Sequence, residues 1–390
     1  MNRLERLRDA GASIWLDTLS RELLETGEFE RLVRDFAVSG ATSNPTIFAK
    51  AITGSDRYDE QLYALAAAGT CDPQELFFAL GLDDIRAAAE LLRPRYDESG
   101  GTDGFVSFEC TPDLADDTRA TIEQALELWR RLDLPNVMIK VPATAAGVPA
   151  IEELTARGVN VNVTLLFAVD RYEQVIDAYL RGLERRLEAR APLERIASVA
   201  SFFVSRVDAK ADAQLSPDSP LRGQVAIANA HRAYGRYLER FADGRWRALE
   251  AKGARSQRPL WASTGTKDPA YSDVLYVERL IAPGVINTMP EKTLFAFADH
   301  GDVERALDSD VTEAERMLAQ AHEAGVHLAG ITGELEREGV RAFSDSYRAL
   351  LDCIDSKLRT VAPDAVAVDE RRRSVRSPLA RARHSGGWSR

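Results

Sequence analysis

The sequence predicts an α/β fold, a closed (β/α)₈ (TIM) barrel with extra helices inserted in it and added at its C-terminal end. Short apolar runs alternate with longer helical patterns through most of the 390 residues, and eight such runs are present. An open doubly wound sheet is the alternative. That fold usually carries a glycine-rich dinucleotide loop after its first strand, whereas residues 19–27 read LSRELLETG.

The eight candidate strands are rich in Val, Ile and Phe and are too short to be helices. Because helical patterns separate them, we expect them to form a parallel sheet. They are residues 14–19, 41–46, 105–110, 137–142, 159–165, 196–204, 259–264 and 285–289.

Helices are predicted where apolar residues recur at spacings of three and four. One such face runs from Tyr172 to Leu187, and another from Ile122 to Leu132. Residues 223–252 indicate a further long helix. Residues 51–100 are expected to add helices between strands two and three, and residues 303–360 to pack around the outside of the barrel.

Residues 1–363 are expected to form a single barrel catalytic domain, followed by a disordered basic tail at 364–390. From Asp369 onward the chain has seven arginines against two acidic residues, with few apolar residues and no periodicity. The tail either binds an acidic partner or is a solvated segment without a function.

Composition excludes several classes of protein. The formal net charge of −11 argues against a general nucleic-acid binder, although a local cationic pocket could still hold a small phosphorylated ligand. No apolar run approaches the roughly 20 residues of a membrane span. The first residues resemble neither a signal peptide nor a transit peptide, and three cysteines without close pairing make no disulfide framework. A cytoplasmic location is therefore expected, while the choice between monomer and homodimer stays open.

Polar side chains interrupt several strands near their C-terminal ends, where barrels of this type have their active sites. Side chains alternate in direction along a strand, so residues two apart share a face. The pairs that share a face are Trp15 with Asp17, Ser107 with Glu109, Met138 with Lys140, and Asn162 with Thr164.

Lys140, within VMIKVP, has two interpretations. It could be a buried lysine in a structural ion pair with Glu109 or Asp17, since buried charge is costly unless it is paired. It could instead be a nucleophile, because burial disfavours the charged form of an amine and a neutral amine attacks a carbonyl to form a Schiff base. That chemistry also needs carboxylates for proton transfer, and strands one and three supply two.

Metal and nucleotide chemistry have no support in the motifs. The five histidines form no ligand pattern, His322 and His327 are five residues apart, and no C-x₂-C occurs. The sequence also lacks G-x-x-x-x-G-K-[ST] and G-x-S-x-G. A metal-dependent enzyme is thus disfavoured, and no metal cofactor is expected.

Seven segments together resemble the transaldolase family, the class I aldolases of the pentose phosphate pathway, over about residues 10–360. The pieces KVPAT and N-x-T-L-L-F are the most specific, and the length fits the longer bacterial branch. The segments are LDTLS (16–20), GATSNPTIF (40–48), VSFE (106–109), IKVPAT (139–144), NVNVTLLF (160–167), SFFVSR (201–206) and WASTGTK (261–267).

The resemblance implies catalytic roles for four residues. Lys140 matches the lysine on strand four that forms the Schiff base. Asp17 matches the carboxylate that takes the proton from the substrate C4 hydroxyl as the C3–C4 bond breaks. Glu109 matches the acid/base that works through a bound water, and Thr164 matches the threonine that holds this water.

The resemblance also implies a substrate site. Asn44 and Asn162 match amides that bind the dihydroxyacetone part, with Thr42 beside them, and Ser201 matches a serine lining the same cavity; Phe203 shares the parity of Ser201. Arg206 and Ser263 match phosphate ligands. Lys267 lies on a predicted loop after strand seven, where barrels often bind phosphate, but it could equally be an ordinary exposed lysine.

We therefore expect a transaldolase that moves a dihydroxyacetone unit from sedoheptulose 7-phosphate to glyceraldehyde 3-phosphate, giving erythrose 4-phosphate and fructose 6-phosphate. Its partners would be small phosphorylated sugars, with no nucleic acid and no membrane. One rival is a fructose-6-phosphate aldolase that releases free dihydroxyacetone. That activity is associated with a tyrosine-type proton donor, whereas this sequence has the carboxylate Glu109, which favours transfer. The other is a non-catalytic phosphosugar-binding protein on the same fold.

Overall fold

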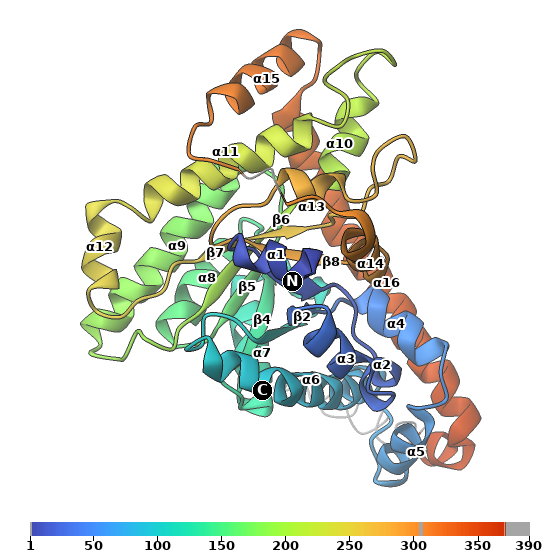
Figure 1. The fold of residues 1–390 in the computed structure, drawn as a ribbon. Coiled ribbons are helices and arrows are strands. Elements are labelled where there is room, and N and C mark those ends of the chain that lie inside the picture. Colours follow the sequence, from blue (N-terminus) through green and yellow to red (C-terminus); the bar gives the residue numbers. More distant parts are fainter. Residues whose placement is uncertain (1, 304–306, 370, 372–390) are drawn as a thin grey trace, which may run out of the picture.

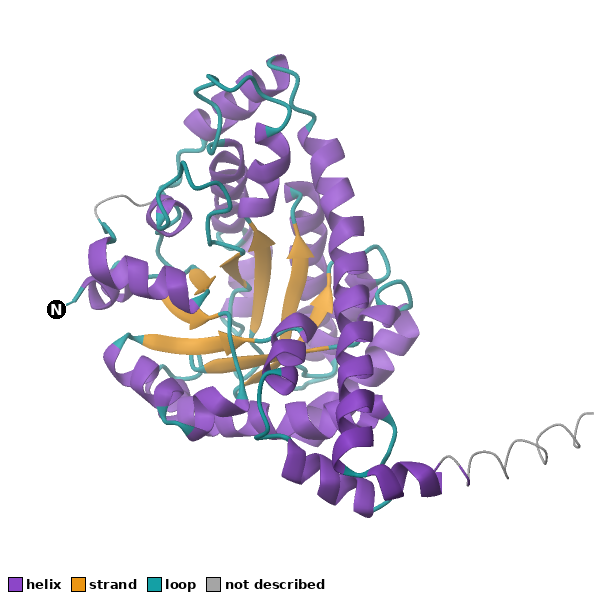
Figure 2. Ribbon diagram, turned by 90° about the vertical axis from the view of Figure 1, so that its right-hand side faces the viewer, coloured by secondary structure: helices purple, strands orange, loops and turns teal. Residues whose placement is uncertain are grey.

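The predicted closed barrel is present in the computed structural model, which describes residues 2–303, 307–369 and 371. Eight parallel strands pair in chain order, and the first pairs with the last to close the sheet. Figure 2 shows the strands surrounded by helices. The strands are β1 (Ser13–Leu16), β2 (Val38–Thr42), β3 (Phe105–Glu109), β4 (Val137–Pro142), β5 (Val161–Leu166), β6 (Ser198–Phe203), β7 (Arg258–Ala262) and β8 (Ile286–Met289).

The helices lie around this barrel, as Figure 1 shows. Those before β3 are α1 (Arg3–Asp9), α2 (Arg21–Glu25), α3 (Glu28–Asp35), α4 (Pro45–Thr53), α5 (Asp59–Ala67) and α6 (Pro73–Glu98). Between β3 and β7 come the 3₁₀ turn η1 (Pro112–Leu114), α7 (Thr118–Leu132), α8 (Gly147–Ala156), α9 (Val169–Glu188), α10 (Ser205–Asp212), α11 (Val225–Arg240) and α12 (Gly244–Glu250). The remainder are α13 (Leu275–Arg279), α14 (Glu291–His300), α15 (Thr312–Glu323) and α16 (Leu328–Val361).

Several predicted boundaries shift by a few residues, and the first strand, expected at 14–19, ends at Leu16. Two of the differences coincide with a helix cap. The second strand ends at Thr42 instead of continuing to residue 46, since the Asn44 side chain caps α4 and Pro45 occupies its first turn. The long helix expected over 223–252 is divided into α11 and α12, because the Asp243 side chain accepts a hydrogen bond from the Trp246 amide and starts a new helix.

The 34-residue helix α16 crosses the outside of the barrel and reaches the C-terminal end of its strands. It contacts α4, α5, α6, α10 and β5, and Figure 1 shows it passing from α10 to α5. Gly339 lets it approach β5 closely, since a Cβ there would lie 2.9 Å from Leu165 Cδ2. The last helix is thereby fixed against the rim where the site lies.

Only part of the chain beyond α16 lies within the residues that the structure describes. Residues 363–369 are helical, and Val366 is buried against the core, which explains why this short stretch is ordered with the barrel. Residue 370 and residues 372–390, the bulk of the predicted basic tail, lie outside the described residues.

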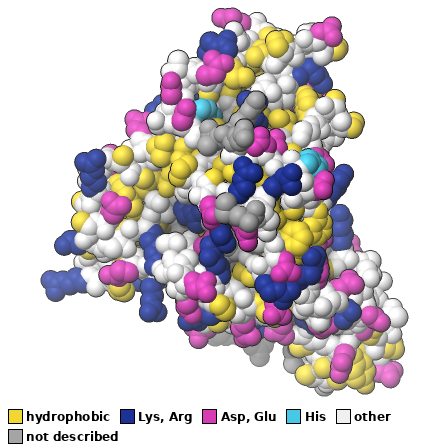
Figure 3. All heavy atoms as spheres, viewed as in Figure 1, with side chains coloured by type: hydrophobic (Ala, Val, Ile, Leu, Met, Phe, Trp, Pro, Cys, Tyr) yellow, Lys and Arg dark blue, Asp and Glu magenta, His cyan; other side chains and the backbone are white. Residues whose placement is uncertain are grey.

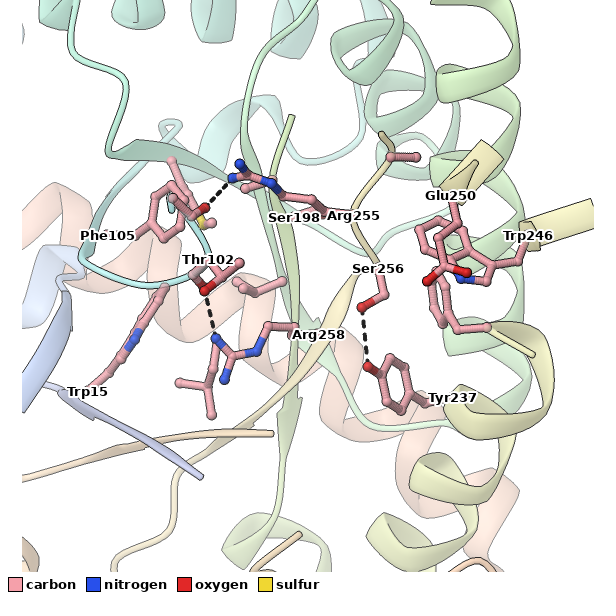
Figure 4. Close-up of a pocket in the computed structure, with 17 residues that line it drawn as sticks. Trp15, Thr102, Phe105, Ser198, Tyr237, Trp246, Glu250, Arg255, Ser256 and Arg258 are labelled. Atoms are coloured by element: carbon pink, nitrogen blue, oxygen red, sulfur yellow. Dashed lines mark hydrogen bonds between the residues drawn. The ribbon is translucent and has the colours of Figure 1, made fainter. Parts of the chain in front are cut away.

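The N-terminal end of the barrel is closed by a hydrogen-bonded network around Arg258, at the start of β7. Its guanidinium donates to the Thr102, Gly284 and Val285 carbonyls and to Ser13 Oγ, all at 2.8–3.0 Å. Figure 4 shows Arg258 reaching Thr102 beside a cavity of about 340 Å³, which Trp15 and Tyr237 also line.

Asp103 completes this network from the loop before β3. It is buried, and its carboxylate accepts hydrogen bonds from Ser13 Oγ at 2.6 Å, Trp15 Nε1 at 2.9 Å and the Gly104 amide at 3.0 Å. Every bond from the acidic and basic groups at this end therefore goes to a fixed protein atom, as expected of a stabilising element.

The outer surface carries charges of both signs. On the face drawn in Figure 3, basic and acidic side chains are interspersed. Within the described residues, no helix combines the length and apolar character needed to cross a bilayer.

Candidate active site

Neighbouring strands bring the predicted polar side chains together inside the C-terminal end of the barrel. In the parallel register Glu109 on β3 lies opposite Lys140 on β4, and Lys140 lies opposite Asn162 on β5. All three are buried. The alternation inferred from sequence is consistent with this arrangement, because residues of one parity face the lumen.

Lys140 lies among groups that hold its amine without saturating it. Nζ donates a 2.9 Å hydrogen bond to the Ser43 carbonyl and lies 3.6 Å from Glu109 Oε2. The second distance is an ion-pair contact but too long for a hydrogen bond. Nζ is also 6.0 Å from the centre of the Phe343 ring on α16, which lies over the amine.

Glu109 has a carboxyl group whose pKa lies near neutral pH. Burial, the largest cause, and the nearby Asp17 charge together raise its pKa from the ordinary 4.5 to about 7, against the opposing effect of Lys140. Its Oε2 is buried and has no hydrogen-bond partner among the described residues. A group with this pKa can both give and take a proton near pH 7.

Asp17 follows β1 directly and continues its ladder, since its amide donates to the Met289 carbonyl at 2.9 Å. Oδ1 accepts a 2.8 Å hydrogen bond from Thr42 Oγ1, which is also 2.9 Å from Thr288 Oγ1. Burial raises the pKa of Asp17, and the charge of Lys140 and the Thr42 hydrogen bond are the main opposing effects. The carboxylate thus has one oxygen held by a hydroxyl.

Thr164 sits at an irregularity that sets its direction. The β5–β6 register shifts between Val163 and Leu166, and Leu165 adopts a positive φ of 60°, an unusual conformation for a bulky residue. The Thr164 hydroxyl is buried without a hydrogen-bond partner in the described part of the chain. Such local strain is typical of functional sites.

A buried layer of amides and hydroxyls lines the lumen at the level of Lys140. Asn162 Nδ2 donates to Ser107 Oγ at 2.9 Å, and Ser201 Oγ donates to Asn162 Oδ1 at 2.7 Å. These bonds fix the orientation of the Asn162 amide, so its direction is set before any ligand arrives.

The predicted phosphate ligands lie near the same rim. Arg206, at the start of α10, stacks its guanidinium 5.2 Å from the Phe203 ring centre, and burial lowers the pKa of this arginine. Ser263 follows β7 with a φ of 57°. Lys267 is exposed on the next loop, and its charge, like that of Arg206, lowers the pKa of Asp17.

Asn44 has a structural task in addition to the predicted one. Its Oδ1 accepts a 3.0 Å hydrogen bond from the Ile47 amide and caps α4. Its side-chain nitrogen is then the part that could face a ligand. The remaining predicted residues lie at the C-terminal ends of their strands or in the loops that follow.

Four neighbours were missed at the level of sequence. Ser107 could have been included, because it shares the face of Glu109. The Ser43 carbonyl gives no side-chain signal, Thr288 lies on the last strand, and Phe343 comes from a helix about 200 residues after Lys140. Only the fold brings these distant segments together.

Within the described residues, no three His, Cys, Asp or Glu side chains are grouped so that they could hold a metal ion. The arrangement instead combines an amine, a carboxyl of raised pKa, a second carboxylate and two buried oxygens that no described residue hydrogen-bonds, all at the C-terminal end of the barrel. Such a set can form and hydrolyse an imine and move protons around it.

Comparison with known proteins gives a consistent family. A family model described as Transaldolase/Fructose-6-phosphate aldolase matches residues 14–354. A protein of Parafrankia sp. named Transaldolase is 50% identical over 92% of this chain and 99% of its own length. Transaldolases of Saccharopolyspora erythraea and Mycobacterium bovis are 50% and 46% identical, each over 92% of this chain and 98% of their own lengths.

Proposed function

Because the chain belongs to the transaldolase/fructose-6-phosphate aldolase family, we propose that it is a transaldolase with Lys140 as its Schiff-base residue. The observation that carries the proposal is the Lys140 amine in the lumen, 3.6 Å from a carboxyl whose pKa is about 7. A phosphosugar-binding protein would not need this pair together with Asp17.

The first half-reaction begins when the Lys140 amine attacks C2 of the ketose. Proton donation by Glu109 lets the C2 oxygen leave as water, and the protonated imine remains. Asp17 then takes the proton of the C4 hydroxyl, the C3–C4 bond breaks, and its electron pair moves into the imine to give an enamine. The aldose product leaves, and the three-carbon unit stays on Lys140.

Glu109 and Thr164 would act on the substrate through a shared water. Both contribute a buried oxygen that no described residue hydrogen-bonds. Buried polar atoms are usually satisfied, so such orphans at one site support a role in binding water or ligand.

The second half-reaction reverses these steps with a different aldehyde. The enamine carbon attacks the acceptor carbonyl, the new hydroxyl receives the proton from Asp17, and hydrolysis of the imine frees Lys140. The lysine itself supplies the electron sink, so the reaction as proposed requires no cofactor.

The substrates proposed are sedoheptulose 7-phosphate as donor and glyceraldehyde 3-phosphate as acceptor, giving erythrose 4-phosphate and fructose 6-phosphate. Thr42, Asn44, Asn162, Ser201 and Phe203 would surround the dihydroxyacetone part. The phosphate would meet Arg206, Ser263 and Lys267, whose guanidinium, hydroxyl and ammonium suit an anion.

The decisive test is borohydride reduction of the protein with fructose 6-phosphate, followed by intact mass and peptide mapping. We expect a dihydroxyacetone or hexose phosphate adduct on Lys140, which Lys140→Ala abolishes and the exposed control Lys252→Ala retains. Absence of an adduct, or an adduct that survives Lys140→Ala, would refute the proposal.

The rival aldolase activity is separated by product analysis. With both fructose 6-phosphate and an acceptor aldehyde present, transfer predicts a new ketose phosphate and little free dihydroxyacetone. Free dihydroxyacetone as the main product would identify an aldolase instead. The cytoplasmic location and a monomeric or homodimeric state belong to the same proposal, and fractionation and light scattering test them.

A further inference from the structure

Two aspartates on α10 are placed one helical turn apart, on the helix that also carries Arg206. Asp208 and Asp212 are both buried. Neither carboxylate is within ion-pair distance of a basic group in the described part of the chain. Buried carboxylates without a cationic partner are costly unless several hydrogen bonds hold them, so their partners explain why they are present.

Each carboxylate hydrogen-bonds two segments to α10, namely the segment with Tyr271 and Tyr276 and the backbone at residues 223–226. Tyr276 Oη donates to Asp208 Oδ2 at 2.9 Å, and Tyr271 Oη donates to Asp212 Oδ2 at 2.7 Å. The other oxygens accept from the Ala226 amide at 2.7 Å and the Gly223 amide at 3.0 Å. Burial raises the pKa of Asp208 to about 7, while the hydrogen bonds from the Ala226 amide and Tyr276 oppose the shift.

The tyrosines belong to the segment that follows β7, and this segment is also tied to α10 at its beginning. Ser205 Oγ lies 2.9 Å from Ser263 Oγ, and the Ser205 amide donates to the Ser263 carbonyl at 3.1 Å. Lys267 lies between these two attachments. The loop is therefore anchored to one helix on both sides of the exposed lysine.

A hollow of about 460 Å³ lies between the loop and the helix, lined by Ser205, Lys267, Tyr271 and Tyr276 among others. A mobile loop loses backbone conformational entropy when one of its residues binds an anion, so prior fixing of the Lys267 loop lowers that cost. Arg206 stands on the same helix, and a fixed loop sets the separation between the two cations.

We propose that Tyr271 and Tyr276 are positioning residues that hold Ser263 and Lys267 in register with Arg206, so that the three bind one phosphate group. The inference rests on the proposed function, because it assumes a phosphorylated substrate at this rim. Neither tyrosine touches the reacting atoms.

The test compares Tyr271→Phe and Tyr276→Phe with Tyr172→Phe. Tyr172 is a matched control, since its hydroxyl is buried on α9 and has no hydrogen-bond partner in the described residues. Steady-state rates are measured at saturating donor, with glyceraldehyde 3-phosphate and with unphosphorylated glyceraldehyde as acceptors. Inhibition by inorganic phosphate is measured in parallel.

We expect each loop variant to raise KM for glyceraldehyde 3-phosphate, and the inhibition constant of phosphate, by about three- to tenfold, the loss of one hydrogen bond. The kcat value and KM for glyceraldehyde should stay unchanged, and Tyr172→Phe should match the wild type throughout. Equal effects on both acceptors, or none on either, would overturn the inference.

Asp212→Asn provides a second probe if a tyrosine variant folds poorly. The amide keeps the carboxylate shape but can accept from only one of Tyr271 and the Gly223 amide, so the same phosphate-specific rise in KM is expected. A wild-type protein without transfer activity would defeat the proposed function, whereas an active wild type with unaffected variants would defeat only the positioning role.

Discussion

The two ends of the barrel both contain buried charged groups, but they differ in how completely these groups are hydrogen-bonded. At the N-terminal end, Arg258 donates hydrogen bonds to three backbone carbonyls, and the Asp103 carboxylate accepts them from Ser13 Oγ and Trp15 Nε1. At the C-terminal end, Glu109 Oε2 and Thr164 Oγ1 are buried without a hydrogen-bond partner among the described residues, and Lys140 Nζ lies 3.6 Å from Glu109 Oε2.

The difference indicates what each end is for. A saturated network resists opening, because removing one member leaves the others buried and unpaired. An unsaturated one costs stability and keeps atoms ready for a ligand. Buried charge alone therefore does not identify an active site, and at the C-terminal end it coincides with oxygens of Glu109 and Thr164 that no described residue hydrogen-bonds.

The largest expected effect is on catalysis at the C-terminal end. Lys140→Met should lower the transferase kcat by at least about 10⁴-fold, because none of the other described lysines lies on a barrel strand to form the imine in its place. The free energy of unfolding should change by no more than about 1 kcal/mol, since Glu109 can take up a proton once the amine is gone. Urea unfolding at pH 7 measures it, and a loss above about 3 kcal/mol would make the pair a structural one.

The next effect is on stability at the N-terminal end. Arg258→Met should lower the free energy of unfolding by about 3–5 kcal/mol, because it leaves three carbonyls and Ser13 Oγ without their donor and removes the positive charge that faces the buried Asp103 carboxylate. The kcat of the folded fraction, measured well below the transition, should equal that of the wild type. A fall in kcat with stability retained would contradict the proposed division between the two ends.

The raised pKa of Glu109 predicts a change of intermediate size in how folding stability depends on pH. Its folded pKa of about 7 lies above its ordinary value of 4.5, so its contribution to stability is present below pH 4.5 and is lost as the pH rises to 7. Glu109→Gln removes this loss. From pH 5 to pH 8 the stability of the variant relative to the wild type should therefore rise by on the order of 2 kcal/mol. Thermal unfolding across this pH range checks the sign, and a constant difference would show that the Glu109 pKa is not raised.

The smallest effects come from one hydroxyl at each end. Ser198 Oγ donates to the Val161 carbonyl and accepts from Gln257 Nε2, so Ser198→Ala should cost about 1 kcal/mol of stability without changing kcat. Thr164→Val removes a hydroxyl that no described residue hydrogen-bonds, so it should leave stability the same or slightly higher and reduce kcat at least about tenfold. Identical outcomes for the two variants would show that unpaired atoms do not mark function here.

Much of the fold was predictable because the barrel has a strong local signature. Buried parallel strands read as short apolar runs, so all eight were found, and Lys140 stood out as a charge within one of them. The second strand was placed late, because ATSNPT contains both a strand end and a helix cap and local propensity does not separate them.

The site was predictable only where the alternation of side chains along one strand, or a family motif, indicated a residue. Parity placed Glu109, Asn162 and Thr164 toward the lumen, and the family resemblance supplied their roles. The pKa of Glu109 could not be predicted, since it depends on burial and on the distances to Lys140 and Asp17. The ties from Tyr271 and Tyr276 to α10 join residues about 60 positions apart and leave no local pattern.

Helix α16 has a consequence for how the protein is made. Phe343 lies over Lys140, yet it belongs to the segment synthesised after all eight strands. At translation rates of roughly 5–20 residues per second, the ribosome needs several seconds after β8 to deliver this helix. The nascent barrel should therefore pass through a stage with its strands complete and the Lys140 amine uncovered, and a chain ending at residue 327 should trap this stage and bind an apolar dye. Catalytic competence would then arrive with the last helix and not with the barrel.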